Sequence, residues 1–447
     1  MKIAIIGSGP LGLEAAAHFD SLGAAVTLFS RDALGGSVKL AATHFPESGE
    51  FLSHHLTQTG LDICGLDQNE IKSFKDYLEN YLTPIGRSLM ERGLVKLADV
   101  TRVHKRFLSL GETPMGKDRL HDLFRVIYSV DPKENVLKQM QENPETFEKL
   151  GQDVLDSLAM PVESFEDFDI VLDATGVFSN PNPMGAGQSF ALNEKSLAQN
   201  CPIYYGLQGI KNFEEITSHH KTILVVGTGE IAAATLAVYG DWVYADPSRS
   251  LKIVTTEMNL FEKLSRAIGR EWIFEKARGV IERNKETLIS KIMEFEKAVV
   301  AWKELPDYER AKLAKPAEPR SQVEFFTGYS VSSVDRLLDR EGMFVTCESV
   351  NFRNPNLSED KELITISADA IIVTTGHVKD VTAYRGLQLS FNNGLDYPEV
   401  RDAKTGESGF YFLGATKKEH GDRYSLAEGL NDILAIEKDI MKFFSRA

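Results

Sequence analysis

The stretch IAIIGSGPLGLEAAAHF, Ile3 to Phe19, decides the fold of this chain. It opens inside a short apolar run rich in β-branched residues, which is typical of a buried strand over Lys2–Ile6. The pattern then predicts a helix over Leu11–Leu22 and a second strand over Ala25–Phe29. Strand, glycine turn, helix and strand together predict a βαβ unit with parallel strands.

The turn inside this unit carries Gly7, Gly9 and Gly12 in Gly-x-Gly-x-x-Gly spacing. The first glycine permits a tight turn, the second lets the backbone approach a pyrophosphate, and the third lets the helix pack on the sheet. A helix that begins at Pro10 and Leu11 aims its unpaired N–H groups and its positive dipole end at such phosphates. The arrangement therefore favours a dinucleotide site.

A second copy of the device occurs in KTILVVGTGEIAAATLAVYG, Lys221 to Gly240. Gly227 and Gly229 match the first two glycines, and Ala232 replaces the third while still allowing close contact between helix and strand. Glu230 and Ile231 begin the predicted helix. Each copy is followed far downstream by a strand that ends in Thr-Gly, at Thr175–Gly176 and at Thr375–Gly376. Two such motifs in one chain predict two bound nucleotides.

Composition narrows the class of protein. The 447 residues carry a net charge of -15, which argues against nucleic acid or an anionic membrane as a partner. No apolar run approaches the roughly 20 residues of a membrane span, and glycines interrupt the only candidate signal sequence, so we expect a cytoplasmic protein. The three cysteines lie far apart in sequence and indicate neither a disulfide framework nor a metal site.

Two segments depart from the α/β pattern. Pro132–Met160 is polar and helical in character, and Asn259–Ala317 is long, charged and strongly helical. In the second segment an apolar stripe predicts either a helical pair that covers its own domain, or a dimer contact, or a lid; a homodimer is thus one open possibility. The stripe is formed by Ile281, Leu288, Ile292, Phe295 and Val299.

The two glycine motifs and the strand ends DATG and TTGH resemble the flavoproteins with two dinucleotide-binding domains, the thioredoxin-reductase-like and flavin-containing-monooxygenase-like pyridine nucleotide oxidoreductases. The resemblance extends from Met1 to about Lys442, apart from the two helical segments. It implies an α/β fold of two Rossmann-type domains, the second inserted in the first, with helical insertions. We expect an FAD-binding domain over 1–195 and 378–447 and an NAD(P)-binding domain over 196–377, with a helical insertion at about 259–317.

The resemblance implies FAD at the first site. Ser30 and Arg31 stand where the family presents an acid to the adenosine ribose, so NADP at this site or an eroded, empty site are the alternatives. Ala415 likewise replaces the aspartate that holds the flavin's ribityl chain in the family. The other implied FAD-binding residues are Gly35 and Gly36 near the pyrophosphate, Val100 in the adenine-side strand, Gly414 at the last strand end, and Tyr424 and Ser425 at the start of the closing helix.

At the second site, Thr256 and Glu257 follow the strand at Leu251–Thr255. A carboxylate suits the free ribose hydroxyls of NADH, which is slightly preferred over NADPH here. The alternative is that Glu257 only caps a following helix.

No closely spaced cysteine pair is present to pass electrons on by disulfide exchange. The remaining acceptors are oxygen, a small oxidised substrate or a partner protein. His420 is a candidate proton relay between the last strand and the closing helix, although its charged neighbours favour a solvent-exposed loop histidine. His44 and His377 are weaker candidates. The sequence thus favours an FAD-dependent NAD(P)H oxidoreductase. A flavin monooxygenase using O2 and a non-catalytic nucleotide sensor with a degenerate flavin site are its rivals.

Overall fold

The chain forms two compact units, one of which is discontinuous in sequence. The first comprises Met1–Asn180 and Val378–Ala447, and the second comprises Pro181–His377. The first crossover therefore precedes the expected boundary at residue 195, because Met184 packs in the core of the second unit and Leu192 pairs with a strand of that unit. The computed structural model describes residues 1–31, 34–49, 56–111, 119, 121–130, 160–261, 271–350, 362–390, 405–414 and 426–444.

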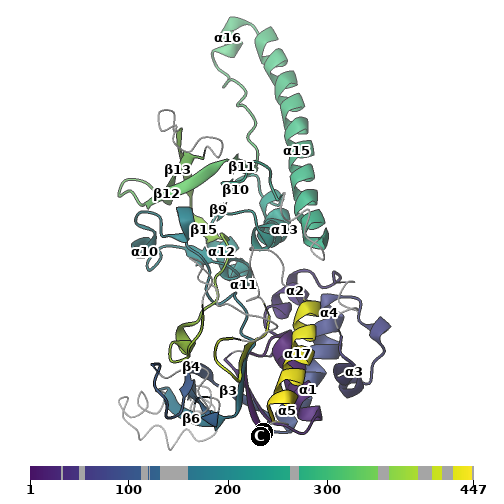
Figure 1. Ribbon diagram of the computed structural model, residues 1–447. Helices are drawn as coiled ribbons and strands as arrows, with labels where there is room; N and C mark the ends of the chain where they lie inside the picture. Colours follow the sequence, from purple (N-terminus) through teal and green to yellow (C-terminus); the bar gives the residue numbers. More distant parts are fainter. Residues whose placement is uncertain are drawn as a thin grey trace, which may run out of the picture. The chain divides into compact units, whose positions relative to one another are not determined.

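The first unit is built on a five-stranded parallel sheet with the order β16-β7-β1-β2-β3 (Figure 1). Its central strands are buried on both faces, as expected for a parallel sheet covered on two sides. The expected strand–helix–strand opening is present. The strands are β1 (Lys2–Ile6), β2 (Ala25–Ser30), β3 (Val95–Leu97), β7 (Ile170–Asp173) and β16 (Phe410–Phe412).

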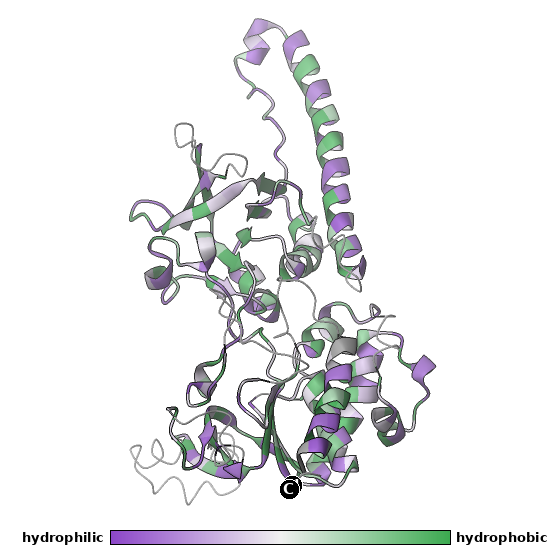
Figure 2. Ribbon diagram, viewed as in Figure 1, coloured by the Kyte–Doolittle hydropathy of each residue, from purple (hydrophilic) through white to green (hydrophobic). Residues whose placement is uncertain are grey.

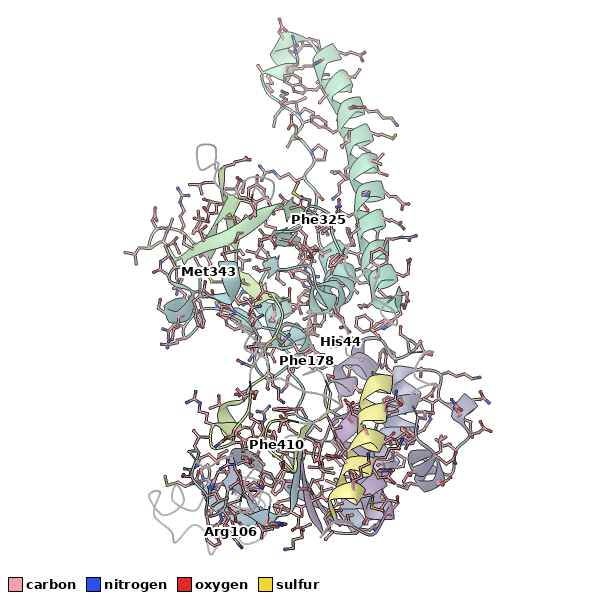
Figure 3. The ribbon with its side chains drawn as sticks, viewed as in Figure 1. His44, Arg106, Phe178, Phe325, Met343 and Phe410 are labelled. Atoms are coloured by element: carbon pink, nitrogen blue, oxygen red, sulfur yellow. The ribbon has the colours of Figure 1, made fainter. Side chains whose placement is uncertain are left out.

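One face of this sheet packs against a three-stranded antiparallel sheet, β4 (Asp99–Lys105), β5 (Phe124–Val130) and β6 (Val162–Phe168). Phe410, labelled in Figure 3, lies in the apolar core between the two sheets. Helices cover the other face. Among them α1 (Pro10–Ser21) and α17 (Leu426–Phe444) lie side by side in Figure 1, joined by a hydrogen bond between His18 and Glu437.

The helical region over residues 74–91 contains six residues of π-helix, Tyr77–Leu82, just before Pro84. Proline has no N–H and crowds the carbonyl four residues earlier, so a wider turn before it avoids the clash. The elements of this region are α2 (Val38–His44), α3 (Gln58–Cys64), the short η2 (Gln68–Glu70), α4 (Phe74–Asp76), the π-helical η3 (Tyr77–Leu82) and α5 (Thr83–Glu91); η5 (Thr382–Tyr384) follows the second crossover.

The second unit repeats this plan. Its parallel sheet has the order β11-β10-β9-β15-β8, an antiparallel sheet β12-β13-β14 packs on one face, and helices cover the other. The strands are β8 (Ile203–Tyr205), β9 (Thr222–Val226), β10 (Ser250–Thr255), β11 (Val323–Thr327), β12 (Tyr329–Asp335), β13 (Met343–Ser349), β14 (Leu363–Ala368) and β15 (Ala370–Val373). The helices are η4 (Ala186–Gln188), α10 (Glu194–Leu197), α11 (Gln208–Lys211), α12 (Phe213–His219) and α13 (Glu230–Tyr244).

From Glu271 onward, where the structure describes it without a gap, the helical insertion contains one long helix, α15 (Glu271–Glu304), followed by the single turn α16 (Asp307–Arg310). Gly240 of α13 lets Val280 approach closely, so the first half of α15 packs on its own unit. Polar and apolar residues alternate along it in Figure 2. Among the described residues, no helix combines the length and the apolar character that a membrane crossing requires. Residues 131–159, which include all of the expected helical segment Pro132–Met160 except Met160, lie outside the described residues.

Candidate nucleotide-binding sites

The first glycine turn joins β1 to α1 with a geometry that only glycine fits. Gly7 has a φ of +103°, and a Cβ there would stand 2.8 Å from the backbone of Ala174 and Thr175. A Cβ on Gly12 would stand 1.8 Å from the carbonyl oxygen of Gly7. Both roles predicted from the motif, the tight turn and the close helix packing, therefore have a direct steric cause.

The N-terminus of α1 is open to a ligand. Gly9 is its N-cap residue, and no side chain caps the helix. No described residue lies within 4 Å of a Cβ built on Gly9. Unpaired N–H groups and the positive end of the helix dipole make such a terminus an anion site, which fits the diphosphate of a dinucleotide.

The end of β2 converges on this turn. The hydroxyl oxygens of Ser8 and Ser30 lie 2.5 Å apart, and Ser30 is fully buried while Arg31 is exposed. The amide of Gly35 donates to the carbonyl of Ser8 at 2.9 Å. A Cβ on Gly36 would stand 3.1 Å from Cα of Gly9. The predicted residues Ser30, Gly35 and Gly36 are thus brought together around the glycine turn.

The strand end DATG closes the turn from the other side. The amide of Ala174 donates to the carbonyl of Ile6 at 2.8 Å. Asp173 accepts hydrogen bonds from the amide and the hydroxyl of Thr175, at 2.8 and 2.7 Å. Gly176 follows with a φ of +69°.

The second glycine turn repeats the first. Gly227 has a φ of +118°, and a Cβ there would stand 2.6 Å from the carbonyl oxygen of Thr374. Gly229 caps α13, again with no side-chain cap and with nothing within 4 Å of an added Cβ. Ala232 is buried in the place of the third glycine. Glu230 and Ile231 begin α13 as predicted.

Glu257 is joined to this second turn. Thr228 donates to its carboxylate at 2.9 Å, and the Thr228 hydroxyl also lies 3.2 Å from that of Thr255 at the end of β10. Residues 258–261 form bends and a turn, and the residues that follow, 262–270, lie outside the described residues. Thr256 is exposed beside it.

The residues around the first glycine turn match the model of a known protein family, and the whole chain is similar in structure to solved proteins. Residues 2–36 match the pyridine nucleotide-disulphide oxidoreductase family. The chain is similar to bacillithiol disulfide reductase from Bacillus cereus (13% identity, TM-score 0.59, covering 100% of each chain). It is also similar to thioredoxin reductase from Lactococcus lactis (13%, 0.54, 100% and 99%) and to the FAD-bound cadaverine monooxygenase DfoA from Erwinia amylovora (11%, 0.56, 98% and 94%).

The chain has the two-domain fold of the flavoprotein reductases. Both the parallel sheets and the neighbouring structures confirm the fold expected from the two glycine motifs. No curated protein matches the chain in sequence.

The structure also gives the positions of several other residues that were expected at the two sites. Val100 lies in β4, half-buried against the core of the first unit. Gly376 and Gly414 both have positive φ, +105° and +95°, at the ends of β15 and β16. Figure 3 labels His44 at the end of α2. Four predictions fall outside the described residues: Ala415, His420, Tyr424 and Ser425.

His377 follows the second Thr-Gly turn and is packed tightly. Burial lowers its pKa from 6.5 to about 4, so the imidazole is neutral at pH 7. A Cβ on Gly206, which has a φ of +55°, would stand 2.5 Å from Nε2 of His377.

The flavoprotein reductase fold here contains a buried ion pair that sequence reasoning missed. Nζ of Lys379 lies 2.6 Å from Oδ2 of Asp173, and both side chains are buried. One signal was visible in the sequence: the strand IVLD is apolar except for its last residue. Its partner follows the second crossover, far away in the chain, and no local pattern points to it.

Proposed function

We propose that this protein is an FAD-dependent oxidoreductase that takes its electrons from NADH. One observation carries the proposal: β1 in the first unit and β9 in the second each run into a glycine turn that begins a helix with no side-chain cap. At both turns no described residue lies within 4 Å of a Cβ built on the second glycine. Two such termini in one chain support two dinucleotides.

FAD is assigned to the first site. Gly9 and the first turn of α1 would hold its diphosphate, with Gly35 and Gly36 lining the same turn. When bound, FAD supplies a ring that accepts a hydride from a reduced nicotinamide. The protein's part is to hold and orient it. Ser30 is a polar group at the position of the family's ribose acid, and its hydroxyl is oriented by Ser8.

NADH is assigned to the second site. The carboxylate of Glu257 lies at the end of β10 beside the glycine turn, where an adenosine ribose is expected to bind. A carboxylate accepts hydrogen bonds from two free ribose hydroxyls but repels the 2′-phosphate of NADPH. Thr228 holds one of its oxygens and so fixes the side chain toward the turn.

The acceptor is proposed to be a small molecule or an electron-accepting protein rather than a disulfide reduced through the chain's own thiols. Cys64, Cys201 and Cys347 are all free. Burial raises the pKa of Cys64 to about 11 and that of Cys347 to about 12, so neither is a thiolate at pH 7. The similarity to an FAD-bound monooxygenase keeps O2 among the small-molecule acceptors to test.

The proposal is tested by titrating the protein with FAD and with NADH, each followed by fluorescence. We expect two independent sites. Gly9→Ala should weaken FAD alone and Gly229→Ala should weaken NADH alone, since both added methyl groups point into the space that a diphosphate would fill. A protein that binds neither, or variants that leave both affinities unchanged, would contradict the assignment and favour the sensor alternative.

A further inference from the structure

We propose that Asp173 and Lys379 are positioning residues of the first nucleotide site: their buried ion pair holds the Thr175–Gly176 turn against the first glycine turn. The inference rests on the proposed FAD site, and it adds residues that no nucleotide motif contains.

The ammonium of Lys379 makes three contacts around one turn. Nζ lies 2.6 Å from Oδ2 of Asp173, donates to Oγ1 of Thr175 at 2.5 Å and donates to the carbonyl of Gly176 at 3.0 Å. Oδ1 of Asp173 accepts from the amide and the hydroxyl of Thr175. The side chains of Lys379 and Asp173 are 1% and 0% exposed, so solvent does not screen the pair.

The turn that they hold forms one wall of the first site. Ala174 and Thr175 present the backbone atoms that leave no room for a side chain on Gly7. Their chain is also joined to β1 by the hydrogen bond from Ala174 to Ile6. A displaced Thr175–Gly176 turn would therefore move the glycine turn that begins α1, and with it the N–H groups aimed at the diphosphate.

The second unit shows that the fold does not itself require a charged pair here. Its equivalent turn, Thr375–Gly376, follows Val373, an apolar residue in the place of Asp173. Asn182, just past the first crossover, holds that turn with neutral groups: its amide N–H donates to the carbonyl of Gly376 at 2.9 Å, and its own carbonyl accepts from the Thr375 hydroxyl at 3.0 Å. The two turns are thus held in the same way, each by the chain that returns from the other unit.

Holding the turn with a buried ion pair has an unfavourable desolvation free energy. Removing two charges from water is unfavourable, and breaking such a pair leaves an uncompensated buried charge, whereas replacing both partners by neutral groups is often tolerated. The charge-balanced variant Asp173→Asn/Lys379→Met should therefore keep the fold while releasing the turn.

The experiment compares this double variant with two others. A matched control, Arg119→Met/Glu407→Gln, removes an equally buried ion pair of the same unit. Glu407 precedes β16, so that pair lies near the amino ends of the parallel strands, whereas Asp173 lies at the carboxyl end of the neighbouring strand β7. The conservative variant Asp173→Asn/Lys379→Gln keeps hydrogen-bonding groups at both positions. The measurements are FAD affinity by fluorescence titration and, without FAD, amide hydrogen exchange of residues 170–180.

We expect Asp173→Asn/Lys379→Met to weaken FAD binding about tenfold or more and to speed exchange at 170–180. Asp173→Asn/Lys379→Gln should recover much of the FAD affinity and of the slow exchange. The control Arg119→Met/Glu407→Gln should leave FAD affinity and exchange at 170–180 unchanged. Unchanged exchange in the first variant would overturn the proposal, whether or not the wild type binds FAD. Equal loss of FAD affinity in the control pair would overturn it too, because the effect would then be general destabilisation. Failure of the wild type to bind FAD would instead count against the proposed function.

Discussion

Thr228 donates a hydrogen bond to the carboxylate of Glu257 at 2.9 Å, joining the second glycine turn to the end of β10. The hydroxyl groups of Thr228 and Thr255 also lie 3.2 Å apart, and this pair corresponds to Ser8 and Ser30 at the first turn. The strand register places Glu257 two residues beyond Thr255, and the corresponding residue of the first unit, Asp32, lies outside the described residues. The carboxylate of Glu257 is the basis for proposing NADH at the second site.

Glu257→Arg should therefore change the choice of cofactor. Replacing the carboxylate with a guanidinium removes the acceptor for the ribose hydroxyls and adds a partner for a 2′-phosphate. We expect the ratio of NADH to NADPH affinity to fall by about tenfold or more, since hydrogen bonds to charged groups contribute roughly 1.5–3 kcal/mol. Thr256→Arg, at the exposed neighbouring residue, is the control. An unchanged ratio would remove Glu257 from this role.

Gly7→Ala and Gly9→Ala should separate stability from binding. Gly7 has a positive φ and its Cβ would collide with Ala174, so Gly7→Ala should lower the free energy of unfolding by about 1–3 kcal/mol. Gly9 has a φ of -68° and open space at its Cβ, so Gly9→Ala should leave the melting temperature of the FAD-free protein unchanged. Thermal unfolding without FAD checks both; a large loss in Gly9→Ala would show that this space is not open.

Burial of His377 should make the protein sensitive to acid. Its folded pKa of about 4 lies below the unfolded value of 6.5, so the unfolded chain binds more protons between these values. The contribution of His377 to the free energy of unfolding is fully present above pH 6.5. It falls as the pH drops toward 4, by up to about 3 kcal/mol. His377→Gln should flatten the dependence of the unfolding midpoint on pH in this window. Equal slopes in variant and wild type would contradict the assignment.

Burial of Lys105 should make the stability of the protein depend on pH in the alkaline range. It is buried, its ammonium lies 3.6 Å from the ring centroid of Phe124, and burial lowers its pKa from 10.5 to about 8. The unfolded chain binds more protons between pH 8 and 10.5, so stability from this group rises with pH across that window. Denaturant unfolding at pH 8 and pH 9.5 should show this rise in the wild type and a smaller one in Lys105→Met. A rise of the same size in both would rule out Lys105 as its source.

Local pattern was enough to predict the parallel strands and both glycine turns. Apolar runs bounded by glycine predicted β1, β9 and the positions of α1 and α13, because those elements are determined by burial and by backbone freedom at Gly7 and Gly227.

Contacts between distant segments could not be predicted. The first crossover falls after Asn180 rather than near residue 195, because the loop beyond it packs into the second unit through Met184. Only folding brings Lys379 beside Asp173 and Ser8 beside Ser30. No period or motif in the sequence records those pairs.

We propose that one chain binds both a flavin and its electron donor. Anaerobic absorption spectroscopy of the purified protein loaded with FAD, with NADH added in stoichiometric steps, is the most direct test. We expect a visible flavin band that NADH bleaches and that air restores. A protein that remains colourless after FAD is added, or a bound flavin that NADH leaves oxidised, would contradict it.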